Sequence, residues 1–352
     1  MINVDFLVIG QGISGSFVSW YLQKGGSSFM VVDKADPFSS SRVAAGIINP
    51  VTGRRIVQTW MIDTLLGFAL NAYTELGTAL DLKAITQKDI VDFFPTPQML
   101  QAFLKRFEED PAYLSLPLAK DTYAPHFNYD FGYGEISPCY AVNIAEILPA
   151  WRKKLNDRNQ LMEDHFDPEQ LNITRDGLRY RGITAQMIIF CDGALAADNP
   201  WFSKLPFAYN KGEALLIKQE ALPTDKIFKK GMNIVPAPEG LFWVGSSYEW
   251  NFTNALPSEI FRQKTIGLLK HWLKEPFEVV DHLASVRPAT IERRPFVGIH
   301  PHHPQLAILN GMGTKGCSLA PFFADQLVNH LTKNTPILKE ADIKRFSRIL
   351  GL

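Results

Sequence analysis

The first 33 residues constrain the fold of this chain more than any other stretch. An apolar run at residues 4–9 ends at Gly10-Gln11-Gly12-Ile13-Ser14-Gly15, and a helical pattern with one apolar face follows it. A second apolar run, residues 29–32, ends at Asp33. Strand, glycine turn, helix, strand and acid thus follow one another within the length of one βαβ unit. This order predicts a parallel sheet of the dinucleotide-binding type.

Each glycine of the turn has a physical role in such a unit. Gly10 allows the tight turn, Gly12 leaves room for a pyrophosphate because it has no Cβ, and Gly15 lets the helix pack close to the sheet. The N–H groups at the start of the helix point at the phosphates. Asp33 is placed to accept hydrogen bonds from a ribose diol. The motif does not separate FAD from NAD, so the rest of the chain must decide between them.

Composition narrows the function classes. A chain of 352 residues predicts two domains, and 46% apolar residues suffice for a sizeable core. Lys plus Arg and Asp plus Glu both number 36, so the net charge is zero. This balance argues against a large positive surface that binds nucleic acid or an anionic membrane, though not against a local positive patch. Cys139, Cys191 and Cys317 are widely spaced without a CxxC pair. This usage argues against a disulfide framework or a zinc site and favours a reducing compartment.

Neither a membrane span nor a metal site is expected. No run of about 18 apolar residues occurs. The apolar stretch at the N-terminus lacks a basic region and belongs to the nucleotide motif itself, so we expect no signal peptide and a cytoplasmic protein. The stretch His300-Pro301-His302-His303 matches no common zinc spacing and is interpreted as a polar surface loop.

The rest of the chain alternates helical and strand patterns. Further helices are expected at residues 57–76, 98–107, 143–155, 258–273, 318–331 and 341–350. Strands are expected at residues 131–142, 163–166, 171–173, 178–181, 187–191, 211–217, 232–235, 241–245 and 306–309. Pro149 is expected to kink its helix. From residue 207 the strands follow one another with turns between them, which is typical of an antiparallel sheet.

Three further stretches are candidates for contact with the nucleotide. Residues 39–46 offer hydroxyls, Arg42 and small side chains, either as a second wall of the site or as a plain polar loop. The buried-type strand 187–191 ends at a glycine, which suits a second close approach or a simple exit turn. Residues 311–316 form another glycine-rich turn before a helix, where Lys315 adds a full charge to the helix dipole. Arg54 and Arg55 could reach an anionic substrate or simply face solvent.

The chain resembles the FAD-dependent amino-acid oxidase superfamily, which includes D-amino-acid, glycine and sarcosine oxidases. The matching pieces are spread over nearly the whole chain in the order of the family: Gly10 to Gly15, Asp33, Ser40 to Gly46, the strand ending at Gly193, Lys211-Gly212-Glu213, Arg287-Pro288, and Gly311 to Gly316 before Leu319-Ala320-Pro321. The resemblance implies an α/β (α+β) fold, with a Rossmann-like FAD/NAD(P)-binding domain and an interleaved substrate domain built on a mixed or antiparallel sheet. The expected FAD domain covers residues 1–80, 140–204 and 287–352, and the substrate domain 81–139 and 205–286.

The resemblance also implies a chemistry and a set of site residues. Such enzymes pass a hydride from the substrate carbon to flavin N5 and release an imine that water hydrolyses. Arg287 resembles the arginine of the family that binds the substrate carboxylate, Lys315 resembles a lysine near it, and Tyr248 could stand in for a substrate-facing tyrosine. The expected cofactor-binding residues are Gly10, Gly12, Ile13, Ser14, Gly15, Asp33, Lys34, Ser40, Arg42, Ala45, Gly46, Phe166, Cys191, Gly193, Gly311, Gly313, Thr314, Lys315 and Gly316.

Some positions depart from the pattern of the family. Val43 and Ala289 stand where some relatives carry the residues that bond the flavin, so non-covalent FAD is expected. Met312 and Asn233 replace residues typical of relatives and leave the substrate and the electron acceptor open. A small amine or amino acid is the expected substrate, with no nucleic acid, no membrane and an undetermined oligomeric state.

Several alternatives remain open. The stretch Ala44-Ala45-Gly46 to Pro50 also looks like the oxidoreductase half of the enzyme that modifies a tRNA wobble uridine. A non-catalytic flavin-binding protein is a second alternative. An NAD-dependent dehydrogenase would explain the first glycine motif but not the turn at Gly311.

Overall fold

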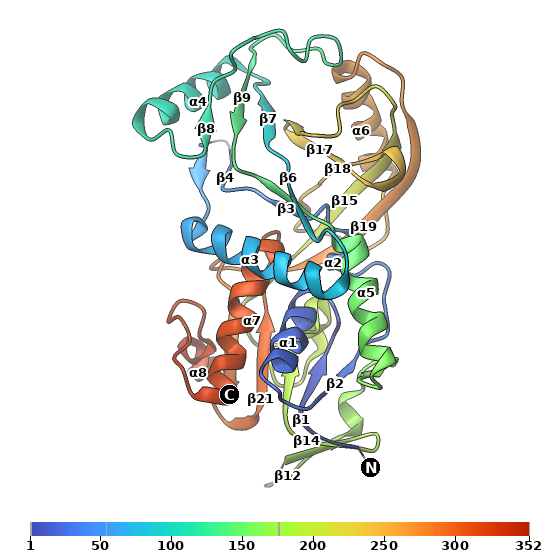
Figure 1. Cartoon of the computed structure of the whole chain (residues 1–352), viewed down its shortest axis with the longest axis vertical. Helices are drawn as coiled ribbons and strands as arrows, with labels where there is room; N and C mark the ends of the chain where they lie inside the picture. Colours follow the sequence, from blue (N-terminus) through green and yellow to red (C-terminus); the bar gives the residue numbers. More distant parts are fainter. Residues whose placement is uncertain (1, 54, 175–176, 352) are drawn as a thin grey trace.

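The computed structural model describes residues 2–53, 55–174 and 177–351. Its elements form two parts stacked along the long axis of the molecule, with helix α3 (Ile62–Leu80) crossing between them (Figure 1). The N-terminal strand and the C-terminal helix both belong to the same part. The chain passes between the two parts several times, as the interleaved prediction requires.

The first part is built on a mostly parallel sheet in the order β11-β2-β1-β14-β13-β12, with β21 added beside β14 and β20 beside β21. Its strands are β1 (Ile2–Ile9), β2 (Phe29–Val32), β11 (Leu161–Met162), β12 (Leu171–Thr174), β13 (Gly177–Tyr180), β14 (Ile183–Phe190), β20 (Phe296–His300) and β21 (His303–Asn310). β1 pairs in parallel with β2 and β14, and β14 pairs in parallel with β21. All four residues of β2 are buried, as expected for a strand covered on both faces.

Helices cover one face of this sheet. They are α1 (Ile13–Lys24), α5 (Ile144–Asp157) and α7 (Gly316–Lys333) (Figure 1). Phe17 of α1, Trp151 of α5 and Phe323 of α7 are fully buried in one cluster with Val8 of β1. Parallel strands need such crossover helices, because a short turn cannot join two strands that run in the same direction.

The second part is an eight-stranded sheet in the order β19-β15-β18-β17-β16-β7-β9-β8. Its strands are β7 (Ile90–Phe93), β8 (Leu114–Ser115), β9 (Tyr133–Ile136), β15 (Phe207–Lys218), β16 (Ile227–Lys230), β17 (Met232–Pro236), β18 (Leu241–Gly245) and β19 (Glu278–Thr290). Helix α6 (Glu259–Trp272) packs on one face through Phe261, Leu269 and Trp272. The other face is turned towards the first part, and α4 (Pro97–Glu109) covers its far end through Phe103. β19 crosses the predicted domain boundary at residue 287 without a break.

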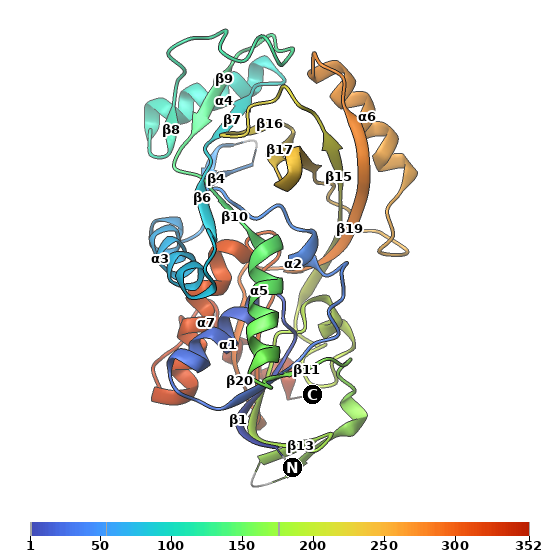
Figure 2. The ribbon, with the colours of Figure 1, turned by 45° about the vertical axis from the view of Figure 1, so that its right-hand side comes forward.

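Short elements lie between the two sheets (Figure 2). β3 (Ile47–Ile48), β10 (Tyr140–Val142) and β6 (Ile85–Gln87) form a three-stranded sheet, and β4 (Val51–Thr52) pairs with β5 (Val57–Gln58). The remaining elements are α2 (Ser40–Val43), η1 (Pro168–Gln170), η2 (Gly193–Asp198), η3 (Pro238–Gly240), η4 (Ile343–Phe346) and α8 (Ser347–Leu350). The structure therefore confirms the predicted class, a parallel α/β unit joined to a largely antiparallel sheet.

Several local predictions were wrong. The helix predicted from residue 57 begins only at Ile62, because residues 57–58 pair as β5. The predicted strand 131–142 is two strands, interrupted where Pro138 has no N–H to donate. The stretch 163–166 is not a strand, and the predicted helix 341–350 is the short pair η4 and α8.

α5 continues past Pro149 over 14 residues, and the kink expected there stays a prediction. The expectation for the histidine stretch changed. His300 is not in a surface loop, because it ends β20 with only 4% of its surface exposed. No group of histidine, cysteine or acidic side chains that could hold a metal occurs among the described residues. In the same part of the chain, no helix has the length and apolar character needed to cross a membrane.

Candidate active site

A cavity of about 2160 Å³ lies between the two sheets. It is lined by both glycine turns, by residues 38–47 and 57–60 and by one face of the second sheet. Ligand pockets for single small molecules usually measure about 300–1,000 Å³. The cavity therefore has room for a dinucleotide and a further small molecule.

The first glycine turn is as tight as the sequence predicts. Gly10 has a φ of +95°, and a Cβ atom there would lie 2.5 Å from the carbonyl oxygen of Cys191. A Cβ atom on Gly15 would lie 1.8 Å from the carbonyl oxygen of Gly10. Gly12, Ile13 and Ser14 line the cavity, whereas Gly15 lies behind them against Gly10. The turn thus brings the N-terminus of α1 to the cavity wall, where the glycines leave the backbone uncovered by side chains.

Asp33 lies at the end of β2 and lines the cavity. Its carboxylate accepts hydrogen bonds from the amide of Gln11 at 2.8 Å, the amide of Ala35 at 2.8 Å and the guanidinium of Arg152 at 2.8 Å. Arg42 lies 3.6 Å away. The protein therefore fixes the carboxylate at the cavity wall, and its contact with a ribose stays a prediction. Arg152, on α5, was missed, because nothing in the sequence indicates that α5 passes this strand end.

The end of β14 forms another wall of the cavity. Cys191, Asp192 and Gly193 all line it. The buried carboxylate of Asp192 accepts a hydrogen bond from Asn199 and one from Asn310, each at 2.9 Å. Burial raises the pKa of Asp192 to about 6. These bonds tie the end of β14 to the end of β21, where the second glycine turn begins.

The second glycine turn packs against β19. A Cβ atom on Gly311 would lie 2.6 Å from the side chain of Thr290, and Gly313 donates its amide to the carbonyl oxygen of Pro288. Lys315 follows at the N-terminus of α7, and its ammonium contacts two neutral oxygens, Asn49 O at 3.3 Å and Thr59 Oγ1 at 3.4 Å. Burial lowers the pKa of Lys315 to about 8. The turn thus places a desolvated cation beside the cavity.

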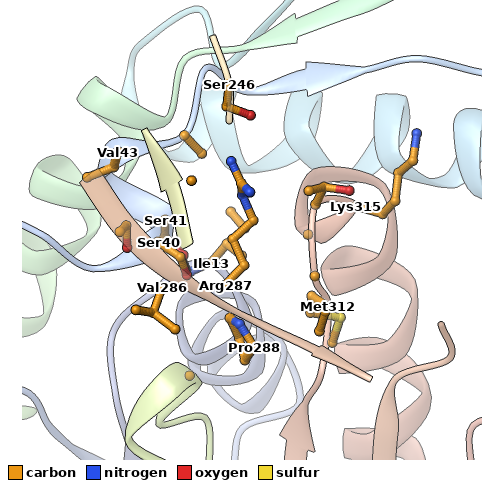
Figure 3. A pocket seen from close by; sticks show the side chains of 18 of the residues that line it. Ile13, Ser40, Ser41, Val43, Ser246, Val286, Arg287, Pro288, Met312 and Lys315 are labelled. Atoms are coloured by element: carbon orange, nitrogen blue, oxygen red, sulfur yellow. Dashed lines mark hydrogen bonds between the residues drawn. The ribbon is translucent and has the colours of Figure 1, made fainter. Parts of the chain in front are cut away.

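Arg287 enters the cavity from β19 and points towards Ser246, with Lys315 on the opposite side (Figure 3). Its Nη1 donates to Asn210 Oδ1 at 2.9 Å and to the carbonyl oxygen of Ser247 at 3.1 Å. The ring of Tyr248 lies 5.0 Å from its Cζ atom. Burial lowers the pKa of Arg287. All of these partners are neutral, and among the described residues no carboxylate forms a salt bridge with Arg287.

Gly212 of β15 makes the position of this guanidinium possible. A Cβ atom on Gly212 would lie 1.7 Å from Arg287 Nη2. Asn210 faces Arg287 across the β15–β19 pair and is fully buried. Sequence reasoning missed Asn210, and it noted Gly212 only as part of a motif, because cross-strand register cannot be read from one strand.

The structure brings the predicted site residues to one cavity, with Gly15 just behind its wall. Those that line it include Lys34, Ser40, Arg42, Ala45, Gly46, Phe166, Thr314 and Gly316, besides the residues described above. Tyr248 stands at the mouth with 51% of its surface exposed. Arg55 also lines the cavity, while Arg54 lies outside the described residues. Lys229, which lines the sheet side of the cavity, was not singled out from the sequence.

The family model of FAD dependent oxidoreductases matches residues 5–330. This chain belongs to that family. It is also similar to the glycine oxidase of Pseudomonas aeruginosa, with 24% identity in an alignment of 366 positions that covers 95% of this chain and 96% of the relative.

Solved structures show the same fold. The glycine oxidase of Geobacillus kaustophilus superposes with a TM-score of 0.81 at 18% identity, covering 99% of this chain and 98% of that one. The L-proline dehydrogenase of P. horikoshii superposes with a TM-score of 0.76 at 15% identity, covering 99% and 98%. At these identities the likeness establishes the fold.

The comparisons confirm the predicted family, the predicted FAD cofactor and the prediction of an FAD-dependent oxidoreductase. Nothing in them favours the tRNA-modifying or the non-catalytic alternative. The described residues also suit the cofactor, because the two bare glycine turns and the size of the cavity allow an extended dinucleotide to lie against the backbone. The contacts of single residues with FAD stay predictions.

Proposed function

We propose that this chain oxidises the C–N bond of a small amine or amino acid that carries a carboxylate. The observation that carries the proposal is Arg287, a guanidinium largely removed from solvent whose partners are all neutral. Keeping an uncompensated charge away from water is unfavourable, and a bound carboxylate relieves that cost through paired, charge-assisted hydrogen bonds. FAD, when bound, accepts the hydride from the carbon that bears the nitrogen.

The other residues position the substrate. Asn210 and the carbonyl oxygen of Ser247 hold one edge of the guanidinium, so its remaining N–H groups face the cavity. Lys315 adds positive charge on the opposite wall. Tyr248 covers the guanidinium on the solvent side and limits its contact with water. A substrate carboxylate would thus be oriented between fixed groups, which is the main contribution that positioning residues make to catalysis.

The test is the replacement Arg287→Met. We expect kcat/KM for acid substrates to fall by about a hundredfold or more, because a charge-assisted bidentate pair is lost, while FAD remains bound. Arg179→Met is the matched control, since Arg179 is exposed on β13 and does not line the cavity. Equal kinetics of the Arg287 variant and the control would refute the role of Arg287.

The substrate class is tested by anaerobic mixing of the yellow holoenzyme with glycine, sarcosine, proline and D-amino acids. Loss of flavin absorbance with one of them supports the proposal and identifies the substrate class. If no compound bleaches the flavin and tRNA binds with salt-sensitive affinity, the tRNA-modifying alternative replaces it.

The non-covalent state of FAD is a further proposal. Val43 and Ala289 line the cavity, and neither an isopropyl nor a methyl side chain can bond covalently to a flavin. Acid precipitation should therefore release the flavin into the supernatant. Flavin that stays with the precipitated protein would contradict this.

A further inference from the structure

The face of the second sheet that is turned to the cavity carries a row of residues aligned across five strands. Ala214 of β15 pairs with Gly245 of β18, Gly245 with Asn233 of β17, Asn233 with Lys229 of β16, and Lys229 with Asp92 of β7. Side chains of directly paired residues project from the same face of a sheet. Ala214, Gly245, Asn233 and Lys229 all line the cavity.

The part of this face that lines the cavity is nearly bare in the middle and has a cation on each side. Gly212, Ala214 and Gly245 leave the centre of the face almost without side chains. Arg287 lies over Gly212 at one end. Lys229, with Asn233 beside it, stands at the other end. A substrate lying on this face would therefore meet a cation at each of its two ends.

Lys229 is held in a fixed position by a carboxylate behind it. Its ammonium donates to Asp92 Oδ2 at 2.7 Å, and the Asp92 side chain is only 1% exposed. The Lys229 side chain is 18% exposed and lines the cavity, whereas Asp92 does not line it. An ammonium has three N–H donors, so two remain for a ligand after the bond to Asp92.

The distance between the two ends sets the size of the substrate. Three strand spacings separate β15 from β16, which amounts to ~14 Å. A hydrogen-bond contact of about 3 Å at each end leaves about 8 Å between the two acid groups, close to the reach of two extended residues. Glycine or sarcosine would fill only the Arg287 end.

We propose that this cavity recognises an amine with two acid groups. Arg287 binds the carboxylate next to the reacting carbon, and Lys229 with Asn233 forms a second site for the distal acid group. The inference rests on the proposed function, because it takes Arg287 as the first anchor. The hydrogen bonds of the site agree with it, since Arg287 donates to neutral groups and Lys229, after its bond to Asp92, has N–H donors left for a second acid group.

The first test uses the FAD-loaded wild-type protein and needs no variant. Adipate and hexanoate are matched six-carbon ligands that differ in one acid group, and binding is followed by calorimetry and by the change in flavin absorbance. We expect adipate to bind about ten- to a hundredfold more tightly, as one added charge-assisted contact implies. Equal affinity would overturn the second site. If neither acid binds, both the second site and the carboxylate-binding role of Arg287 fail.

Substitutions at Lys229 and Asp92 test whether these residues cause the preference for adipate over hexanoate. The pair Lys229→Met and Asp92→Leu is changed together, so that no buried carboxylate is left alone. We expect the preference for adipate to disappear while the affinity for hexanoate stays unchanged, and Lys229→Arg to keep most of the preference. Lys230→Met is the matched control, because Lys230 projects from the opposite face and donates to the carbonyl oxygen of Asn128.

The outcomes separate the two claims. A double variant that keeps the preference for adipate would overturn the role of Lys229. A double variant that loses both acids equally would also overturn it. Loss of hexanoate binding in Arg287→Met, but not in the Lys229 variants, would support both anchors. Unchanged hexanoate binding in Arg287→Met would refute the proposed function, whatever the Lys229 variants show.

Discussion

The substitution Gly212→Ala tests the site without removing any charge or donor. An alanine Cβ would lie 1.7 Å from Arg287 Nη2 and 2.1 Å from its Cζ. Non-bonded carbon atoms prefer separations of about 3.5–4.0 Å, so the guanidinium has to move by about 2 Å. Gly212 has no positive φ, and the strand backbone accepts alanine. The disturbance therefore falls on the side chain of Arg287 and not on the fold.

The displacement breaks the two hydrogen bonds that fix the guanidinium. These run from Nη1 to Asn210 Oδ1 and to the carbonyl oxygen of Ser247. Hydrogen bonds to charged groups contribute about 1.5–3 kcal/mol each, and a misplacement of about 1 Å in a catalytic site can cost a hundredfold in rate. A total of about 3 kcal/mol corresponds to a hundredfold fall in kcat/KM.

The assay is steady-state kinetics with the best carboxylate substrate, together with flavin absorbance as a measure of bound FAD. We expect KM to rise, with FAD content and thermal stability close to wild type. Gly267→Ala is the matched control, because a Cβ on Gly267 in α6 meets no atom within 4 Å. An unchanged kcat/KM in Gly212→Ala would refute the proposed geometry of Arg287.

Three further predictions follow from other contacts. Gly15→Ala should abolish FAD retention, measured by absorbance after desalting, because its Cβ would lie 1.8 Å from the carbonyl oxygen of Gly10. Burial lowers the pKa of Lys315 to about 8, so its positive charge and the kcat/KM for acid substrates should decline as pH rises through that value. In Lys315→Arg this decline should disappear below pH 10, since arginine stays charged. Glu213→Ala should lower the free energy of unfolding in urea by about 1.5–3 kcal/mol, because it removes the buried carboxylate 3.0 Å from the Lys211 ammonium and leaves that ammonium with Glu249, at 3.9 Å.

The local features of the fold were predictable from the sequence. The βαβ unit at residues 2–32 could be predicted because the conformation of each glycine and each apolar run depends on only a few neighbouring residues. The same holds for the second glycine turn at Gly311. Errors occurred where strand pairing decides, as at residues 57–58, which pair with β4 instead of extending α3. Pattern alone cannot distinguish a short paired segment from the first turn of a helix.

The arrangement of the site was less predictable. Arg287 and Lys315 could be named from motifs, but Asn210, Lys229 and Arg152 could not, because their positions depend on strand register and helix packing. A shift of one residue in pairing would turn the whole row of the second sheet away from the cavity. A single sequence with no relatives beside it does not fix that register. The residues that we propose to set substrate length are thus the hardest ones to predict from the sequence.

The pairing of β1 with β14, and of β14 with β21, also has a consequence for synthesis of the protein. The two glycine turns that face the same cavity, at Gly10 and Gly313, are separated by about 300 residues of chain. At about 5–20 residues per second, roughly 15 to 60 s pass between the emergence of the first turn and that of the second. During this interval β1 can pair with β2 and later with β14, but β14 lacks its partner β21 and the cofactor has only part of its binding surface. FAD should therefore stabilise the nearly complete chain but give little help to a nascent one.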